Sequence, residues 1–291
     1  MRVSKNHVIY AMDKNNTPVL RAHSGDTIVF ETIDCFSCSL TSEAQGIDAV
    51  DFNKVNPATG PLFIEGAKAG DTLKVSIKKI DIADTGVSVA VPGLGRFGEK
   101  IKESSTRLIS VKDNQAHFLD FSIPLKKMVG VIGVAPAGEP VVTGIPGKHG
   151  GNLDCTQIAE GAILYLPVEV DGALLAMGDL HATMGDGEVG GAGAEINGEV
   201  TVQVEVLKDF DFATPIIETK DKWITLASHQ SLDEATNQAV FNMGDFIAKK
   251  TGLAINDVSM LMSFSANVIA CQLVNPNVTI RVEISKSLLK K

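Results

Sequence analysis

Three stretches far apart along the chain alternate apolar and polar residues with a period of two, which is typical of half-buried strands. They are residues 72–80, 199–207 and 277–284. Shorter apolar runs bounded by turn residues predict further strands at 163–170, 173–177 and 223–227. Each half-buried strand needs a second layer to cover its apolar face. The pattern therefore predicts a mainly β fold with an antiparallel β-sandwich or barrel-like core.

Local turn and capping signals add detail to this expectation. Asp171-Gly172 lies between two of the apolar runs and predicts a hairpin that joins them. Ser231 and Glu234 form a capping box ahead of apolar residues at helical spacing, and Gly252 suits the position after that helix. Asn256 is the expected N-cap of a second helix that reaches Ile269. The sequence thus predicts a C-terminal helical pair.

The overall composition indicates a globular chain. Of its 291 residues, 44% are hydrophobic and 21% are charged, which excludes a disordered protein. We expect a single compact unit over residues 1–291. Within it, an N-terminal β half (1–125) and a C-terminal half (126–291) with the site motifs and both helices can be distinguished.

Charge and cysteine content restrict the partners and the compartment. The formal net charge of -9 disfavours nucleic acid and anionic membrane surfaces. No apolar stretch approaches the roughly 20 residues that span a bilayer, and no signal-peptide core is apparent. Four cysteines are too few for a disulfide scaffold. We expect a cytoplasmic protein with reduced cysteines and without nucleic-acid or membrane partners.

A glycine-rich segment carries the strongest chemical signal, because 14 of the 27 glycines lie within residues 138–198. Asp179 and His181 are two residues apart at the end of an apolar run, so in a strand they share a face. A carboxylate and an imidazole form half of a metal site, for which Asp154 or Glu195 can supply the third ligand. Mixed nitrogen and oxygen donors suit Zn²⁺, and also Fe²⁺ or Mn²⁺. Additional Ca²⁺ in the acidic loops stays open.

Other readings of the chemistry are weaker. The segment contains no phosphate-binding P-loop motif. Cys35 and Cys38 have the spacing of a redox pair or of half a zinc site. No second cysteine pair and no thioredoxin-like pattern accompany them, so two partly buried thiols are favoured. Cys155 remains an alternative nucleophile if His149 or His181 activates it.

The same segment resembles a known family. The motifs HGGNLD (149–154), GDLH (178–181) and GDGE (185–188), together with ETID (31–34) and TGPLFIEGA (59–67), are similar to those of the acetamidase/formamidase family. The resemblance implies a β-sandwich hydrolase that converts short aliphatic amides to a carboxylate and ammonia. It also implies metal dependence, with zinc favoured, and a homo-oligomer of at least two chains.

On this reading Asp154, Asp179 and His181 are the expected metal ligands. A carboxylate near the metal must take a proton from water and pass it to the leaving nitrogen. Glu195 is the first choice for that role and Glu188 is the second.

A separate group is expected to stabilise the oxyanion. Its members are His149, Asn152 and the backbone amides of Gly150 and Gly151. Asp34 is expected to reach the same pocket from the N-terminal half of the chain.

Two alternatives remain at this point. The same site could hydrolyse a cyclic or substituted amide. The chain could also be a non-enzymatic β-sandwich that binds a ligand or calcium, although a single Trp and two Tyr disfavour a sugar-binding platform.

Overall fold

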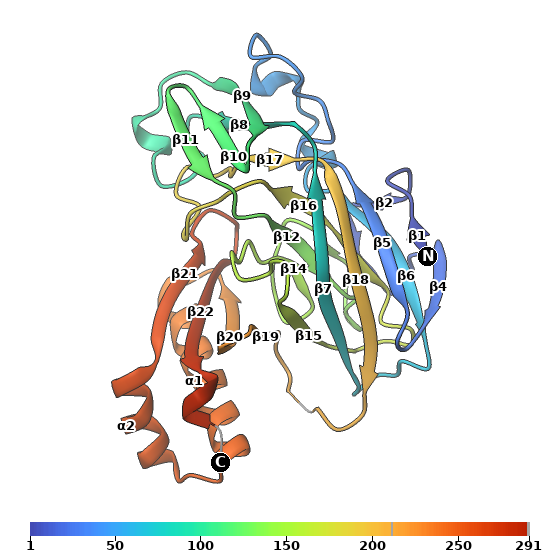
Figure 1. Cartoon of the computed structure of the whole chain (residues 1–291), viewed down its shortest axis with the longest axis vertical. Helices are drawn as coiled ribbons and strands as arrows, with labels where there is room; N and C mark the ends of the chain where they lie inside the picture. Colours follow the sequence, from blue (N-terminus) through green and yellow to red (C-terminus); the bar gives the residue numbers. More distant parts are fainter. Residues whose placement is uncertain (211, 290–291) are drawn as a thin grey trace.

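The computed structural model describes residues 1–210 and 212–289 (Figure 1). The chain is mainly β, as predicted, and its two α-helices lie at the C-terminal end. None of the helices in these described ranges is long and apolar enough to cross a membrane.

The first sheet has nine strands within the described residues, ordered β1-β5-β18-β7-β15-β19-β20-β22-β21. All neighbours are antiparallel except β1 and β5. The bounds in spatial order are β1 (Arg2–Val3), β5 (Thr27–Thr32), β18 (Gly198–Leu207), β7 (Thr72–Ile82), β15 (Ile163–Pro167), β19 (Ile216–Glu218), β20 (Lys222–His229), β22 (Val278–Ser285) and β21 (Asn267–Gln272). The three long alternating stretches are thus strands β7, β18 and β22 of one sheet.

The second sheet has eleven strands in the same described ranges, with the path β11-β10-β9-β8-β17-β16-β12-β14. Strand β6 pairs with β16 and with β2 and β4, while β3 and β13 form a separate pair. The bounds are β2 (Val8–Ile9), β3 (Ala11–Met12), β4 (Leu20–His23), β6 (Ala58–Glu65), β8 (Thr85–Ala90), β9 (Ser105–Lys112), β10 (Gln115–Phe118), β11 (Phe121–Pro124), β12 (Met128–Gly133), β13 (Val141–Val142), β14 (Gly150–Asn152), β16 (Leu175–His181) and β17 (Glu195–Ile196). Short 3-10 turns are η1 (Ile47–Ala49), η2 (Phe52–Lys54), η3 (Gly98–Lys100) and η4 (Lys286–Leu289).

A shared apolar core joins the two large sheets. Ile77 of β7 and Val202 of β18 belong to the same buried cluster as Ile132 of β12 and Leu180 of β16. Removing such a side chain from water stabilises the fold by roughly 1.5–3 kcal/mol. Every residue of β12 and β16 is buried, so any polar side chain on these strands is desolvated. The site described below lies on β16.

The prediction of a hairpin at Asp171-Gly172 is wrong. Strand β15 pairs with β7 and β19 in the first sheet, whereas β16 pairs with β12, β17 and β6 in the second. The turn therefore carries the chain from one sheet to the other. All residues of β16 are buried, so both faces of this strand need to be covered. Its place between β12, β17 and β6 in the second sheet provides that cover.

The first helix follows its sequence signals closely. Helix α1 (Leu232–Thr251) begins where Ser231 Oγ accepts a hydrogen bond from the Glu234 amide at 3.4 Å. It ends at Gly252, which has a left-handed φ of 72°. Met243 and Phe246 on α1 share an apolar cluster with Ile280 of β22, so the helix packs on the first sheet.

The second helix differs from expectation. Helix α2 (Ile255–Ser265) begins after Ala254, which makes no side-chain cap, rather than at Asn256. The chain leaves the helix at Ala266, and Ile269 lies in β21 opposite Arg281 of β22. Pairing at the sheet edge prevails over the helical spacing of this apolar residue.

Candidate active site

Five buried titratable residues converge beside β16, and we call them the acidic cluster. They are Asp154, Asp179, His181, Glu188 and Glu195, and none is more than 8% exposed. Asp179 and His181 come from β16, and Glu195 of β17 pairs directly with His181. Asp154 follows β14, and Glu188 lies in the connection from β16 to β17. Segments distant along the chain thus build one site.

The imidazole of His181 lies among the carboxylates. Its Nε2 is 2.9 Å from Glu195 Oε2, 3.5 Å from Asp179 Oδ1 and 4.0 Å from Asp154 Oδ1. The Gly193 amide donates to Glu195 Oε1 at 2.7 Å. One oxygen of Glu195 is therefore anchored to the backbone, while the other faces the imidazole.

Several polar atoms of the cluster lack hydrogen bonds within residues 1–210 and 212–289. Three of them are buried without a hydrogen-bond partner: Asp154 Oδ1, Asp179 Oδ1 and His181 Nδ1. Glu195 Oε2 also makes no hydrogen bond, although it lies at ion-pair distance from His181 Nε2. A buried carboxylate oxygen without a donor is costly, and a bound cation would satisfy it. The donor set of carboxylates and an imidazole therefore fits a divalent metal.

Two groups of donor atoms are compact enough to hold an ion. One comprises Asp154, His181 and Glu188, and the other comprises Cys35, Asp179 and Glu195. Within each group the donor atoms lie within 4.8 Å of one another. The three predicted ligands are thus near neighbours, although they are divided between the two groups.

Burial dominates the protonation of the cluster. It raises the pKa of Asp154 and of Glu195 to about 7, and it raises the pKa of Glu188 well above the usual range. Burial opposes a charge on His181, but Glu195 and Asp179 together raise the pKa of this imidazole well above its ordinary value. A carboxyl group with a pKa near 7 can both accept and return a proton at neutral pH.

The backbone holds three of the four acids in an uncommon conformation. The φ angles are 42° at Asp154, 56° at Asp179 and 44° at Glu188. Residues other than glycine rarely occupy this left-handed region, at a cost of order 1–3 kcal/mol each, and such residues gather at functional sites. The fold therefore retains strain where the carboxylates meet.

Gly130 of β12 provides the space that two carboxylates occupy. A Cβ at this position would lie 2.6 Å from Asp154 Oδ1 and 2.8 Å from Asp179 Oδ2. We expect Gly130→Ala to weaken metal binding about 10- to 100-fold and to lower the free energy of unfolding by about 1–3 kcal/mol. Metal titration and urea unfolding measure the two effects. Gly138→Ala is the control, because a Cβ there meets no atom within 4 Å. Equal metal affinity in both variants would contradict the prediction.

The expected oxyanion group is only partly available. The Gly150 amide donates to the Gly147 carbonyl at 3.1 Å, which removes it from the free donors. Gly151 pairs with Ile132 of β12. Asn152 is buried, and its Oδ1 has no partner among the described residues.

His149 is buried, and burial lowers its pKa to about 4, so the imidazole is neutral at pH 7. Its Nε2 has no hydrogen-bond partner in the described part of the chain.

Asp34 shapes a loop near the cluster. Its Oδ1 accepts hydrogen bonds from the amides of Phe36 and Cys38, both at 2.9 Å. Burial raises the pKa of Asp34, and the negative charge of Asp179 adds to this effect. The carboxylate therefore fixes the loop that carries Cys35.

Sequence reasoning missed two residues of the site. Cys35, interpreted as a plain buried thiol, lies with Asp179 and Glu195. Asn275 donates from Nδ2 to Asp154 Oδ2 at 3.0 Å and to the Asn152 carbonyl at 3.2 Å. No local spacing could reveal Asn275, because 121 residues separate it from Asp154.

Cys155, the alternative nucleophile, lies outside this arrangement. Burial opposes its ionisation, but Cys271 and Arg281 lower its pKa, and no histidine contributes among the main causes. The geometry therefore favours the acidic cluster over a cysteine nucleophile.

An ion pair ties the Glu188 loop to the first sheet. Both terminal nitrogens of the buried Arg281 contact Asp186, at 2.7 and 2.8 Å. The Gly187 amide donates to the Cys271 carbonyl of β21 at 2.8 Å. Asp186 therefore anchors the residues that precede Glu188.

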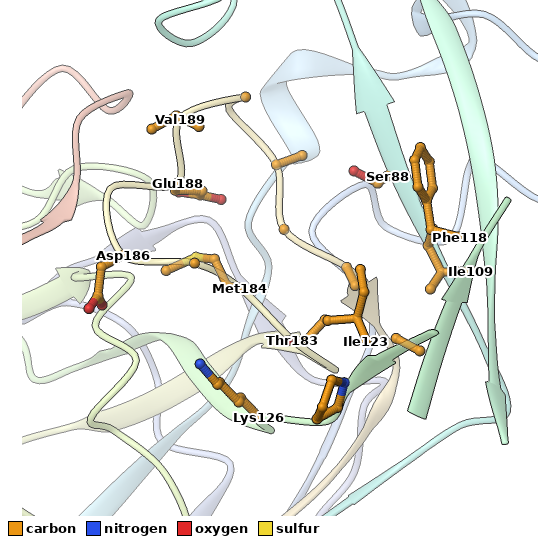
Figure 2. A pocket seen from close by; sticks show the side chains of 17 residues that line it. Ser88, Ile109, Phe118, Ile123, Lys126, Thr183, Met184, Asp186, Glu188 and Val189 are labelled. Carbon is orange, nitrogen blue, oxygen red and sulfur yellow. The ribbon is translucent and has the colours of Figure 1, made fainter. Parts of the chain in front are cut away.

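A cavity of about 590 Å³ adjoins the cluster (Figure 2). Glu188 and Gly193 form part of its wall. A Cβ at Gly193 would lie 3.0 Å from His181 Nδ1, so little separates the cavity from the imidazole. Of the five residues of the acidic cluster, Glu188 alone lines the cavity.

Known proteins resemble the chain in sequence and fold. It is 46% identical to acetamidase from Bacillus halodurans, with a TM-score of 0.97 over 99% of this chain and 98% of that one. A predicted acetamidase/formamidase from Thermoanaerobacter tengcongensis is 44% identical, with a TM-score of 0.97 over 99% and 96%. Formamidase from Methylophilus methylotrophus is 42% identical over 74 residues, which are 25% of this chain and 18% of that protein.

The chain spans 60% or less of the length of the curated relatives that it matches. The model of the Acetamidase/Formamidase family nevertheless matches residues 14–142 and 137–290. The matched ranges include every residue of the acidic cluster. The protein therefore belongs to the acetamidase/formamidase family.

Proposed function

We propose that the protein is a metal-dependent amidase that hydrolyses linear amides to a carboxylate and ammonia. The observation that carries the proposal is the buried acidic cluster, in which carboxylate oxygens without hydrogen bonds converge on one imidazole. Such a desolvated site with perturbed pKa values, next to a cavity, is suited to hydrolytic chemistry.

Asp154, Asp179 and His181 would hold the metal, with Zn²⁺ as the first candidate. When bound, such a metal polarises the amide carbonyl and lowers the pKa of a water molecule toward about 7. Asn275 supports the arrangement, because its amide holds the second oxygen of Asp154. Asp179 is held by the strained backbone of β16.

Glu195 is the proposed proton carrier. Its Oε1 is fixed by the Gly193 amide, and its Oε2, which lies 2.9 Å from His181 Nε2, is the oxygen that would accept a proton and pass it to the leaving nitrogen. Glu188, at the cavity wall, is the second candidate for this role. Neutral His149 and the side-chain amide of Asn152 are the remaining candidates for oxyanion stabilisation.

The test combines elemental analysis of the purified protein with an ammonia-release assay on formamide, acetamide and propionamide. We expect about one to two divalent ions per chain, ammonia release that a chelator abolishes, and recovery when Zn²⁺ is restored. Release that persists after complete metal removal would contradict the metal dependence. A metal-replete protein that releases ammonia from none of these amides, and that opens no cyclic amide to the corresponding amino acid, would instead be a binding protein.

A further inference from the structure

The cavity beside the acidic cluster is larger and more apolar than the shortest amides require. Apolar side chains line it from β9, β10, β11 and the loop after β16 (Figure 2). They include Ile109, Phe118, Ile123, Met184 and Val189. Its volume of about 590 Å³ lies within the range of roughly 300–1,000 Å³ typical of pockets for drug-sized molecules.

Two residues of the cavity wall lie against the acidic cluster. Glu188 lines it, and a carboxylate oxygen of Glu188 lies within 4.8 Å of the donor atoms of Asp154 and His181. Gly193 lines the cavity too, and a Cβ on this residue would lie 3.0 Å from His181 Nδ1. The imidazole is therefore packed against the backbone of the cavity wall. For an amide bound beside Glu188, this cavity is therefore the adjoining space that can take the substituent.

The remaining charges do not suit an ionic substituent. Apart from Glu188, the charged residues of the lining are Lys126 and Asp186, which have opposite signs. Asp186 is already engaged by Arg281. A neutral, apolar group therefore fits the space better than a charged one.

We infer that this cavity is an acyl-chain subsite, and that amides with a longer alkyl or an aromatic acyl group are better substrates than formamide or acetamide. The inference rests on the proposed amidase function. Acetamide presents one methyl group and leaves most of the apolar wall unused. Each methylene added to the acyl group would move from water onto the apolar wall, which favours binding.

The first measurement is kcat/KM for a series from acetamide to hexanamide, with benzamide for comparison. Burial of one methylene corresponds to about a fourfold gain in kcat/KM, so the four added methylenes of hexanamide should raise kcat/KM over that of acetamide by roughly 200-fold. A kcat/KM that stays level or falls along the series would overturn the subsite.

The matched variants are Ile123→Glu and Leu119→Glu. Both residues belong to the β10–β11 hairpin and are exposed, but Ile123 lines the cavity and Leu119 does not. We expect Ile123→Glu to reduce the ratio of kcat/KM for hexanamide to kcat/KM for acetamide at least 10-fold. Leu119→Glu should leave the ratio unchanged. An equal ratio in the two variants counts against the subsite.

A binding measurement distinguishes failure of the subsite from failure of the proposed function. If no amide is hydrolysed, the proposed function fails, and calorimetry with hexanamide tests the cavity independently. Hexanamide binding that Ile123→Glu weakens at least 10-fold, and Leu119→Glu does not, supports the subsite. Hexanamide binding no tighter than acetamide binding overturns it.

Discussion

Replacing Glu195 by glutamine is expected to lower kcat for amide hydrolysis by about 10²- to 10⁴-fold, with little change in KM. The amide side chain preserves the size of glutamate but cannot accept the proton. The Gly193 amide, which donates to Oε1 at 2.7 Å, should hold the variant side chain in the same position. Steady-state kinetics with the best amide substrate measures the effect.

The control for this variant is Glu139→Gln, because Glu139 is exposed and is not a member of the acidic cluster. Metal content should be close to that of the wild type, which separates lost proton transfer from lost metal. If Glu195→Gln retains wild-type kcat, the proton carrier is another residue, and Glu188→Gln becomes the next variant.

Replacing His181 by alanine is expected to remove both metal and activity. The imidazole lies within 4.0 Å of three carboxylates, so its loss deletes a ligand and leaves buried acids without their positive partner. Breaking such a buried pair typically costs about 3–5 kcal/mol. Elemental analysis, ammonia release and urea unfolding should therefore all change together.

His23→Ala is the matched control for this second variant, since His23 is exposed. It should retain metal, activity and stability. A His181→Ala protein that folds and keeps its full metal content would exclude His181 as a ligand.

The alternating sequence pattern predicts the strands better than it predicts their partners. Residues 72–80 and 199–207 lie side by side as β7 and β18, with Val75 opposite Val204. The pattern reports only which face of a strand is buried. The runs around Asp171-Gly172 are apolar on both faces, so nothing local shows that they enter different sheets.

The site shows the same limit. Asp179 and His181 converge as expected, with 3.5 Å between Asp179 Oδ1 and His181 Nε2. The regular-strand argument is nevertheless incomplete, because Asp179 has a φ of 56° and departs from the extended conformation. Cys35 and Asn275 enter only through tertiary contacts, which a single sequence does not encode at any fixed spacing.

The left-handed backbone at Asp154, Asp179 and Glu188 also bears on how this protein can be altered. Glycine would adopt these angles without strain, so a screen that rewards heat resistance alone would favour glycine there. Variants enriched in that way would gain thermal stability while they lost the carboxylates. Only a selection that demands amide turnover would retain the acids, and any programme to stabilise this protein should therefore hold these three positions fixed.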